Sequence, residues 1–179
     1  MKFFQCLVNP TNFKINKGNI KLTSEEADYC IKYPDSMDGS VEINQINENI
    51  NIELKQDFPS EDPVIINLKN LSECNVHLNN GVINSEFLCP IMRIKVDNGS
   101  VSAKLSKYTT GLVKAHVNIG ILNNTSDLTK VQNDNPQNTF FGMNFMNMNT
   151  GLNNNIELMG TLDYCTAIFE IGAGTMDLS

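Results

Sequence analysis

The sequence predicts an all-β protein: a single-chain parallel β-solenoid (β-helix) of about 7–8 rungs, with roughly 20 residues in each rung. Three observations predict this fold. Apolar and polar residues alternate over short segments, as in a strand with one buried face. Glycines recur between these segments at similar spacing. Asn is abundant, with 27 of 179 residues, whereas only 18% of residues are charged, which suits turns and hydrogen-bonded ladders more than helix surfaces.

The repeat is a ten-residue frame that reads apolar-x-apolar-x-x-Gly-x-apolar-x-apolar. It first occurs at residues 13–22, centred on Gly18. It returns around Gly81, Gly99, Gly120 and Gly174. Around Gly39 only the second half fits, with Val41 and Ile43, and around Gly151 only the first half fits, with Met146 and Met148.

The spacing between successive frames predicts the number of rungs and the extent of the domain. Successive frame glycines are 21, 42, 18, 21, 31 and 23 residues apart. The interval of 42 fits two rungs, and segments 49–54 and 64–68 supply the strands of the unmarked one. The interval of 31 is one rung plus about ten residues. We therefore expect one solenoid domain over residues 1–179, with a loop insertion at about 123–139.

The x-x-Gly step is expected to be a turn, because Asn-Gly and Asp-Gly pairs permit a positive φ. The same pairs also mark two-residue hairpins, so an antiparallel sandwich or meander is the alternative. A repeat of about 20 residues holds a strand, a bend, a second strand and a return, which favours the solenoid. Its rungs would stack about 4.8 Å apart into a rod about 40 Å long.

Stacked rungs place equivalent residues in columns. One apolar column is expected to contain Ile20, Val41, Ile83, Val101, Leu122 and Met176. A second is expected to contain Ile15, Leu78, Val96, Val117, Met148 and Ile171. Asn79, Asp97 and Asn118 are expected to form a hydrogen-bonded ladder at the corner. Residues 1–8 and 176–179 are expected at opposite ends of the rod, where unpaired strand edges could permit end-to-end assembly.

Three runs resemble a known repeat. They are residues 79–83 (NNGVI), 96–101 (VDNGSV) and 171–178 (IGAGTMDL). These runs resemble the "NGS-V" rungs of the "putative adhesin" family, a domain of unknown function, and the resemblance covers residues 10–179. It implies a single-chain β-helix and a binding role, and the family has no established catalytic residues to carry over.

The net charge, the apolar runs and the cysteine pattern limit which partners and which cellular compartment are expected. The net charge of −7 argues against nucleic acid or an anionic membrane as the main partner. The apolar run at residues 3–8 is too short for a signal peptide, and no stretch approaches the 18–20 apolar residues of a membrane span. We expect a cytoplasmic protein, although a secreted or surface protein whose signal was removed would look the same. The five cysteines form no CxxC pair and are expected to be reduced.

Residues that could carry chemistry have structural explanations. A thioether cluster could bind Cu(I), but core filling is the better interpretation of Met143, Met146 and Met148 and the neighbouring Phe140, Phe141 and Phe145. Cys74 and His77 lie three apart in a strand and so point to opposite faces. His116 lies between two core positions and should face outward.

Paired carboxylates for glycoside cleavage could come from Glu25, Glu26 and Asp28, or from Glu61 and Asp62. Sugar-cleaving sites usually add Arg or Trp, and this chain has one Arg (Arg93) and no Trp. We expect no catalytic residue, no cofactor and no metal ligand. The predicted function is a non-catalytic structural or binding module that presents polar faces and the 123–139 loop to a protein or glycan. One alternative is a cytoskeleton-like β-helix that polymerises end to end, and a second is a carbohydrate-active enzyme.

Overall fold

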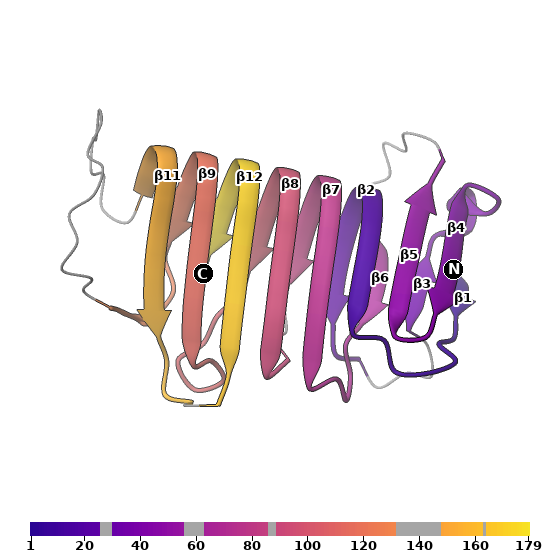
Figure 1. Ribbon diagram of the computed structural model, residues 1–179, viewed down its shortest axis with the longest axis horizontal. Helices are drawn as coiled ribbons and strands as arrows, with labels where there is room; N and C mark the ends of the chain where they lie inside the picture. The colour runs from indigo at the N-terminus through magenta and orange to yellow at the C-terminus, as the bar shows by residue number, and fades with distance from the viewer. Residues whose placement is uncertain (26–29, 56–62, 86–88, 132–147, 163) are drawn as a thin grey trace.

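The computed structural model describes residues 1–25, 30–55, 63–85, 89–131, 148–162 and 164–179 (Figure 1). All strands belong to one mixed twelve-stranded sheet, so the predicted all-β class is confirmed. Helix among these residues is limited to one 3-10 turn, Asp35–Met37. Across the ranges that the structure describes, no helical segment has the length and apolar composition needed to cross a lipid bilayer. The strands are β1 (Lys2–Phe4), β2 (Asn12–Thr23), β3 (Ile31–Tyr33), β4 (Val41–Ile46), β5 (Asn49–Leu54), β6 (Val64–Asn67), β7 (Glu73–Ser85), β8 (Ile91–Ala103), β9 (Leu112–Asn124), β10 (Thr129–Lys130), β11 (Met148–Met159) and β12 (Thr166–Leu178).

The long strands fold over at their central glycines. In β2, β7, β8, β9 and β12 the frame glycine has a φ between +133° and +146°, a region that residues with a side chain rarely adopt. Each of these strands rises on one side of the molecule, turns over, and descends on the other (Figure 1). The result is two layers, which we call the front layer (the first halves of these strands, with β4 and β5) and the back layer (their second halves, with β1, β3 and β6).

The core lies between the two layers and is built from the apolar columns. Register pairs Ile15, Leu78, Val96, Ile171 and Val117 in one column, and Ile20, Ile83, Val101, Met176 and Leu122 in the other. Every one of these side chains is at most 1% exposed. The columns are therefore confirmed for ten of the twelve expected members. The two exceptions are Val41, which pairs with Leu54, and Met148, which pairs with Asn123.

The two segments expected to supply the unmarked rung form the strands β5 and β6. β5 pairs in parallel with the first half of β2, and β6 pairs in parallel with its second half. The preceding segment follows the hairpin alternative, because β4 pairs antiparallel to β5 across a turn at Asn47, which has a φ of +53°. Val41 thus lies in a hairpin and not in a rung of its own.

The order of the strands differs from that of a sequential solenoid. The sheet runs β2-β7-β8-β12-β9-β11, so the C-terminal strand lies between β8 and β9. The expectation that the two chain ends lie at opposite ends is wrong: the N-terminus lies at one end of the stack, whereas the C-terminal strand β12 is an internal strand between β8 and β9 (Figure 1). β8, β9 and β12 carry the same frame, so β12 matches β8 and β9 equally well, glycine against glycine.

The strand around Gly151 runs in the opposite direction. β11 pairs antiparallel to β9, with Gly151 opposite Gly120. Ile156 lies opposite Ala115, and Leu158 lies opposite Val113. β11 keeps the apolar pattern only in part: Ile156 and Leu158 are buried, whereas Asn154 lies opposite the buried Val117.

Two cysteines are bonded, which corrects the expectation of five reduced thiols. Cys6 and Cys30 form a disulfide. The pairing of β1 with β3 brings them together, since Phe4 lies opposite Ile31 and its carbonyl accepts a 3.0 Å hydrogen bond from the Cys30 amide. The other three cysteines are free thiols.

The predicted 123–139 insertion is described only in part. Asn123 and Asn124 complete β9, and Thr129 and Lys130 form β10 against the end of β11. The remainder, 132–139, lies outside the described residues. So do several predicted candidates: Glu26, Asp28, Glu61, Asp62, Phe140, Phe141, Met143, Phe145 and Met146.

Candidate functional site

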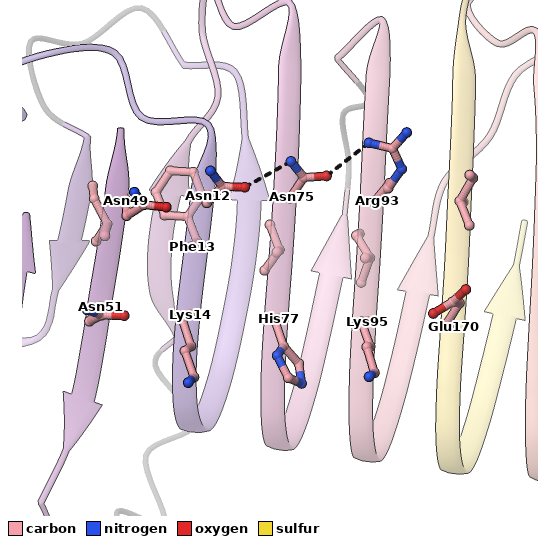
Figure 2. A pocket seen from close by; sticks show the side chains of 14 residues that line it. Asn12, Phe13, Lys14, Asn49, Asn51, Asn75, His77, Arg93, Lys95 and Glu170 are labelled. Atoms are coloured by element: carbon pink, nitrogen blue, oxygen red, sulfur yellow. Dashed lines mark hydrogen bonds between the residues drawn. The ribbon is translucent and has the colours of Figure 1, made fainter. Parts of the chain in front are cut away.

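A broad hollow of about 700 Å³ crosses the outer side of the front layer. It extends over β5, β2, β7, β8 and β12 (Figure 2). Its backbone floor includes the buried Phe13, Ile50, Val76 and Ile94. We call its outward-facing polar side chains the polar face; they are Asn12, Lys14, Asn49, Asn51, Asn75, His77, Arg93, Lys95 and Glu170.

The polar face follows directly from strand alternation. Residues six and four before each frame glycine point away from the core, because those five and three before it point inward. Register then aligns them across strands. Asn12, Asn75 and Arg93 form a first row, which ends at the apolar Ile168 of β12, and Lys14, His77, Lys95 and Glu170 form a second (Figure 2).

A hydrogen-bonded chain fixes the first row. The Asn75 Nδ2 group donates to Asn12 Oδ1 at 3.0 Å, and Arg93 Nη1 donates to Asn75 Oδ1 at 3.4 Å (Figure 2). The same Arg93 nitrogen lies 3.3 Å from Glu73 Oε1. A guanidinium has five N–H donors, so Arg93 keeps donors for a ligand while its position is held.

Contacts with Asp97 hold two side chains of the second row. His77 Nε2 lies 3.0 Å from Asp97 Oδ2, and Lys95 Nζ lies 3.8 Å from Asp97 Oδ1. These contacts replace the expected ladder of Asn79, Asp97 and Asn118. The ladder does not form because β12 lies between β8 and β9, which places Gly172 and not a polar side chain between Asp97 and Asn118.

A second hollow of about 410 Å³ adjoins the polar face toward the glycine bend. It shares Lys14 and Asn51 with the first and adds Asn16, Asn44, Glu53 and Asn79. The Asn16 amide donates to the Leu54 carbonyl at 3.0 Å and accepts from the Leu54 N–H at 2.9 Å. One side chain thereby holds β5 against β2 beyond the end of their backbone pairing.

The chemistry of the polar face is that of amides and ion pairs. Such groups donate and accept hydrogen bonds in alternation, which suits a ligand rich in hydroxyl groups. Among the lining residues Glu170 is the one carboxylate, whereas glycoside cleavage uses two carboxyl groups on either side of the bond. The arrangement therefore fits binding better than hydrolysis.

The individually predicted residues are placed as follows. Cys74 is buried and His77 is half-exposed on the polar face, so their predicted opposite orientation is confirmed. His116 faces outward as expected, with its Nδ1 atom 2.5 Å from Asn155 Oδ1. Glu25 is exposed, and the carboxylates expected to pair with it lie outside the described residues.

Reasoning from the sequence did not single out the polar face. The information was present in the frame, at the positions six and four before each glycine. Those positions hold Asn12 and Lys14, then Asn75 and His77, then Arg93 and Lys95. What the frame does not give is the order of the strands, and so it does not show that Glu170 follows Lys95 in the second row.

Comparisons with known proteins define the fold only. No family model matches the chain, and no curated protein matches it. A solved structure from Clostridium sporogenes ATCC 15579, described as a "putative cell adhesion protein", is similar with a TM-score of 0.52 and 11% sequence identity. The similarity covers 99% of this chain and 96% of that one. At this level of identity, the likeness shows that the two chains share an all-β fold over their full lengths.

Proposed function

We propose that this protein is a non-catalytic binding module and that its polar face binds a glycan. The observation that supports this most is the alignment of amide and charged side chains in two rows across β2, β7, β8 and β12. Adjacent strands lie about 4.8 Å apart, so the rows offer hydrogen-bonding groups at regular intervals. A chain of sugar residues presents hydroxyl groups at regular intervals in the same way.

A glycan fits this surface better than a protein does. Protein interfaces rely on large apolar and aromatic side chains at their centres. The hollow is lined outward by Asn, Lys, His, Arg and Glu, with Ile168 as the one outward-facing apolar side chain, and its phenylalanine, Phe13, is buried at 1% exposure. Hydrogen bonds in an open hollow exchange with water, so each site is expected to bind weakly and to depend on several contacts at once.

Three further observations support a role outside the cell. The similar solved structure is described as a "putative cell adhesion protein", and the sequence resembles the "putative adhesin" repeat. The Cys6–Cys30 disulfide favours an oxidising compartment over the cytoplasm that the sequence led us to expect. We therefore propose an exported, adhesin-like protein. The absence of enzyme activity stays a prediction.

The test is a glycan array probed with the labelled protein, followed by calorimetry on the glycans that bind. Asn75→Ala, which removes the central amide of the first row, should reduce affinity at least tenfold, and Arg93→Ala should do the same. Asn84→Ala is the matched control, because Asn84 makes an equivalent bond to Asn19 (3.3 Å) in the back layer. Equal affinity for the Asn75→Ala and Asn84→Ala variants would contradict the proposal, as would an array without binding.

A further inference from the structure

Positive charge gathers in the larger hollow of a protein that is acidic as a whole. Among the described residues that line this hollow are three cations, Lys14, Arg93 and Lys95, and one carboxylate, Glu170. The whole chain, by contrast, has 20 acidic and 13 basic side chains and a net charge of −7. The hollow therefore differs in charge from the rest of the molecule.

Two of the three cations are compensated by carboxylates outside the lining. Arg93 Nη1 lies 3.3 Å from Glu73 Oε1, and Lys95 Nζ lies 3.8 Å from Asp97 Oδ1. Lys14 differs from both, because it is exposed and forms no ion pair within the ranges that the structure describes. Its positive charge is therefore left for a ligand.

The surroundings of Lys14 suit an anionic group. Its side chain lines both hollows, so it stands where the two meet. Register places Lys14 of β2 beside Asn51 of β5 on one side and beside His77 of β7 on the other (Figure 2). Asn51 is exposed, and its amide can donate hydrogen bonds next to the ammonium group. An ammonium group with an N–H donor beside it binds the oxygens of a carboxylate or a sulfate.

The other end of the second row carries the opposite charge. Glu170 of β12 forms no ion pair among the described residues either, and three strand spacings, about 14 Å, separate β12 from β2. A negatively charged group on a ligand is therefore attracted near Lys14 and repelled near Glu170. This difference gives a ligand on the polar face one preferred direction.

We propose that the glycan bound by the polar face is acidic and that Lys14, with Asn51 beside it, holds its carboxylate or sulfate group. This inference rests on the proposed function and adds the class of glycan and its orientation. The charged sugar lies over β5 and β2, and the uncharged part of the chain extends over β7 and β8 toward β12, along the first row.

The test compares matched pairs of glycans on the array. Each pair consists of a chain with uronate or sulfate groups and the same chain with its carboxyl groups reduced to alcohols or its sulfates removed. We expect the acidic member to bind about tenfold more tightly or better, with an affinity that falls as sodium chloride is added. Binding confined to the uronate pairs would support a carboxylate as the group held, and binding confined to the sulfated pairs would support a sulfate.

The failures of the two proposals are distinguishable. Equal binding of the acidic and neutral members of the pairs would overturn this inference and leave the proposed glycan-binding function intact. Absence of binding to any member would overturn both.

A pair of lysine variants tests the assignment of Lys14. Lys14→Gln keeps an exposed polar side chain and removes the charge, so it should weaken binding of the acidic glycan about tenfold or more and that of the neutral form less than about twofold. Lys130→Gln is the matched control, because Lys130 is also exposed but lies on β10, outside the hollow. It should bind both forms like the wild type. Equal weakening of the acidic and neutral forms by Lys14→Gln would overturn the assignment, as would equal losses in the two variants.

Discussion

At the scale of single residues, the fold depends on glycines that stack directly on one another. A Cβ atom built on Gly99 would lie 1.8 Å from the Gly81 carbonyl oxygen, and one on Gly174 would lie 1.6 Å from the Gly99 oxygen. These are backbone atoms of paired strands, which cannot move without separating the strands. Glycine is therefore required here both by its positive φ and by the lack of space.

The stacking predicts that replacing a frame glycine by alanine destabilises the fold by different amounts at different positions. Gly99→Ala should lower the free energy of unfolding by about 3 kcal/mol or more, because alanine would be strained at this positive φ and its Cβ would also clash with the Gly81 backbone. Gly18→Ala should cost only about 1–2 kcal/mol. At Gly18 the nearest atom to a new Cβ is a movable Leu54 side-chain carbon at 3.3 Å. Urea titrations of both variants check the order, and equal costs would contradict the stacking.

The apolar columns predict a second contrast. Val101 is 0% exposed between the layers, whereas its neighbour Ser100 faces outward from the back layer. Val101→Asp should cost about 4 kcal/mol or more, since the neighbouring strands offer an isolated carboxylate nothing but apolar side chains. Ser100→Asp should change stability by less than about 0.5 kcal/mol. Similar losses in the two variants, measured by thermal unfolding, would show that the alternation is misassigned.

At the scale of elements, the sequence predicted what each strand buries but not which strand lies beside it. The columns containing Ile15 and Ile20 follow from alternation, which is local information. The insertion of β12 between β8 and β9 does not follow, because identical frames make any two rungs compatible. The reversal of β11 does not follow from the frame either, because Asn154 and Asn149 lie opposite the core residues Val117 and Leu122.

The position of β12 predicts that the C-terminus is essential to the fold. A chain that ends at residue 165 lacks the strand that pairs with both β8 and β9. We expect this truncated chain to lose cooperative thermal unfolding and to aggregate through the exposed strand edges. A chain that lacks residues 1–8 loses the edge strand β1 and the Cys6–Cys30 disulfide but keeps every strand from β2 to β12, and should still unfold cooperatively, at a lower midpoint. Cooperative unfolding of the 1–165 chain would contradict the assigned strand order.

The disulfide predicts a redox-dependent stability at the N-terminal end. Cys6 and Cys30 are separated by 24 residues, and a loop of this size corresponds to about 3 kcal/mol in the chain-entropy model. Cys6→Ser should lower the free energy of unfolding by about this amount, and a reducing agent should then have no further effect through this pair. Calorimetry with and without dithiothreitol measures both. A wild-type protein whose stability does not depend on the reductant would count against the bond.

At the scale of the whole molecule, the ends of the stack are unequal. At the β4 end, the Gln45 side chain accepts a hydrogen bond from the Leu7 amide at 2.8 Å and donates to the Val8 carbonyl at 2.9 Å. The N-terminal segment is thereby held beside β4, which hinders pairing with another copy. At the opposite end, β10 pairs with only the last two residues of β11.

This asymmetry bears on the polymer alternative. An end-to-end filament needs two complementary ends, whereas a stack in which the N-terminal segment hinders pairing at one end permits at most a symmetric dimer. Size-exclusion chromatography with light scattering over a hundredfold range of concentration should give a mass near 19.9 kDa and no species larger than a dimer. A mass that continues to climb with concentration would favour the end-to-end polymer over the binding module.

The central claim is that the polar face of the front layer is where this protein binds its partner. The most direct test is a nuclear magnetic resonance titration of the ¹⁵N-labelled protein with the glycan that scores highest on the array. The account predicts amide shifts at Asn12, Asn75, His77, Arg93 and Lys95, and unchanged amides at Asn84 and Ser102 in the back layer. Shifts confined to the back layer or to the ends of the stack would contradict it.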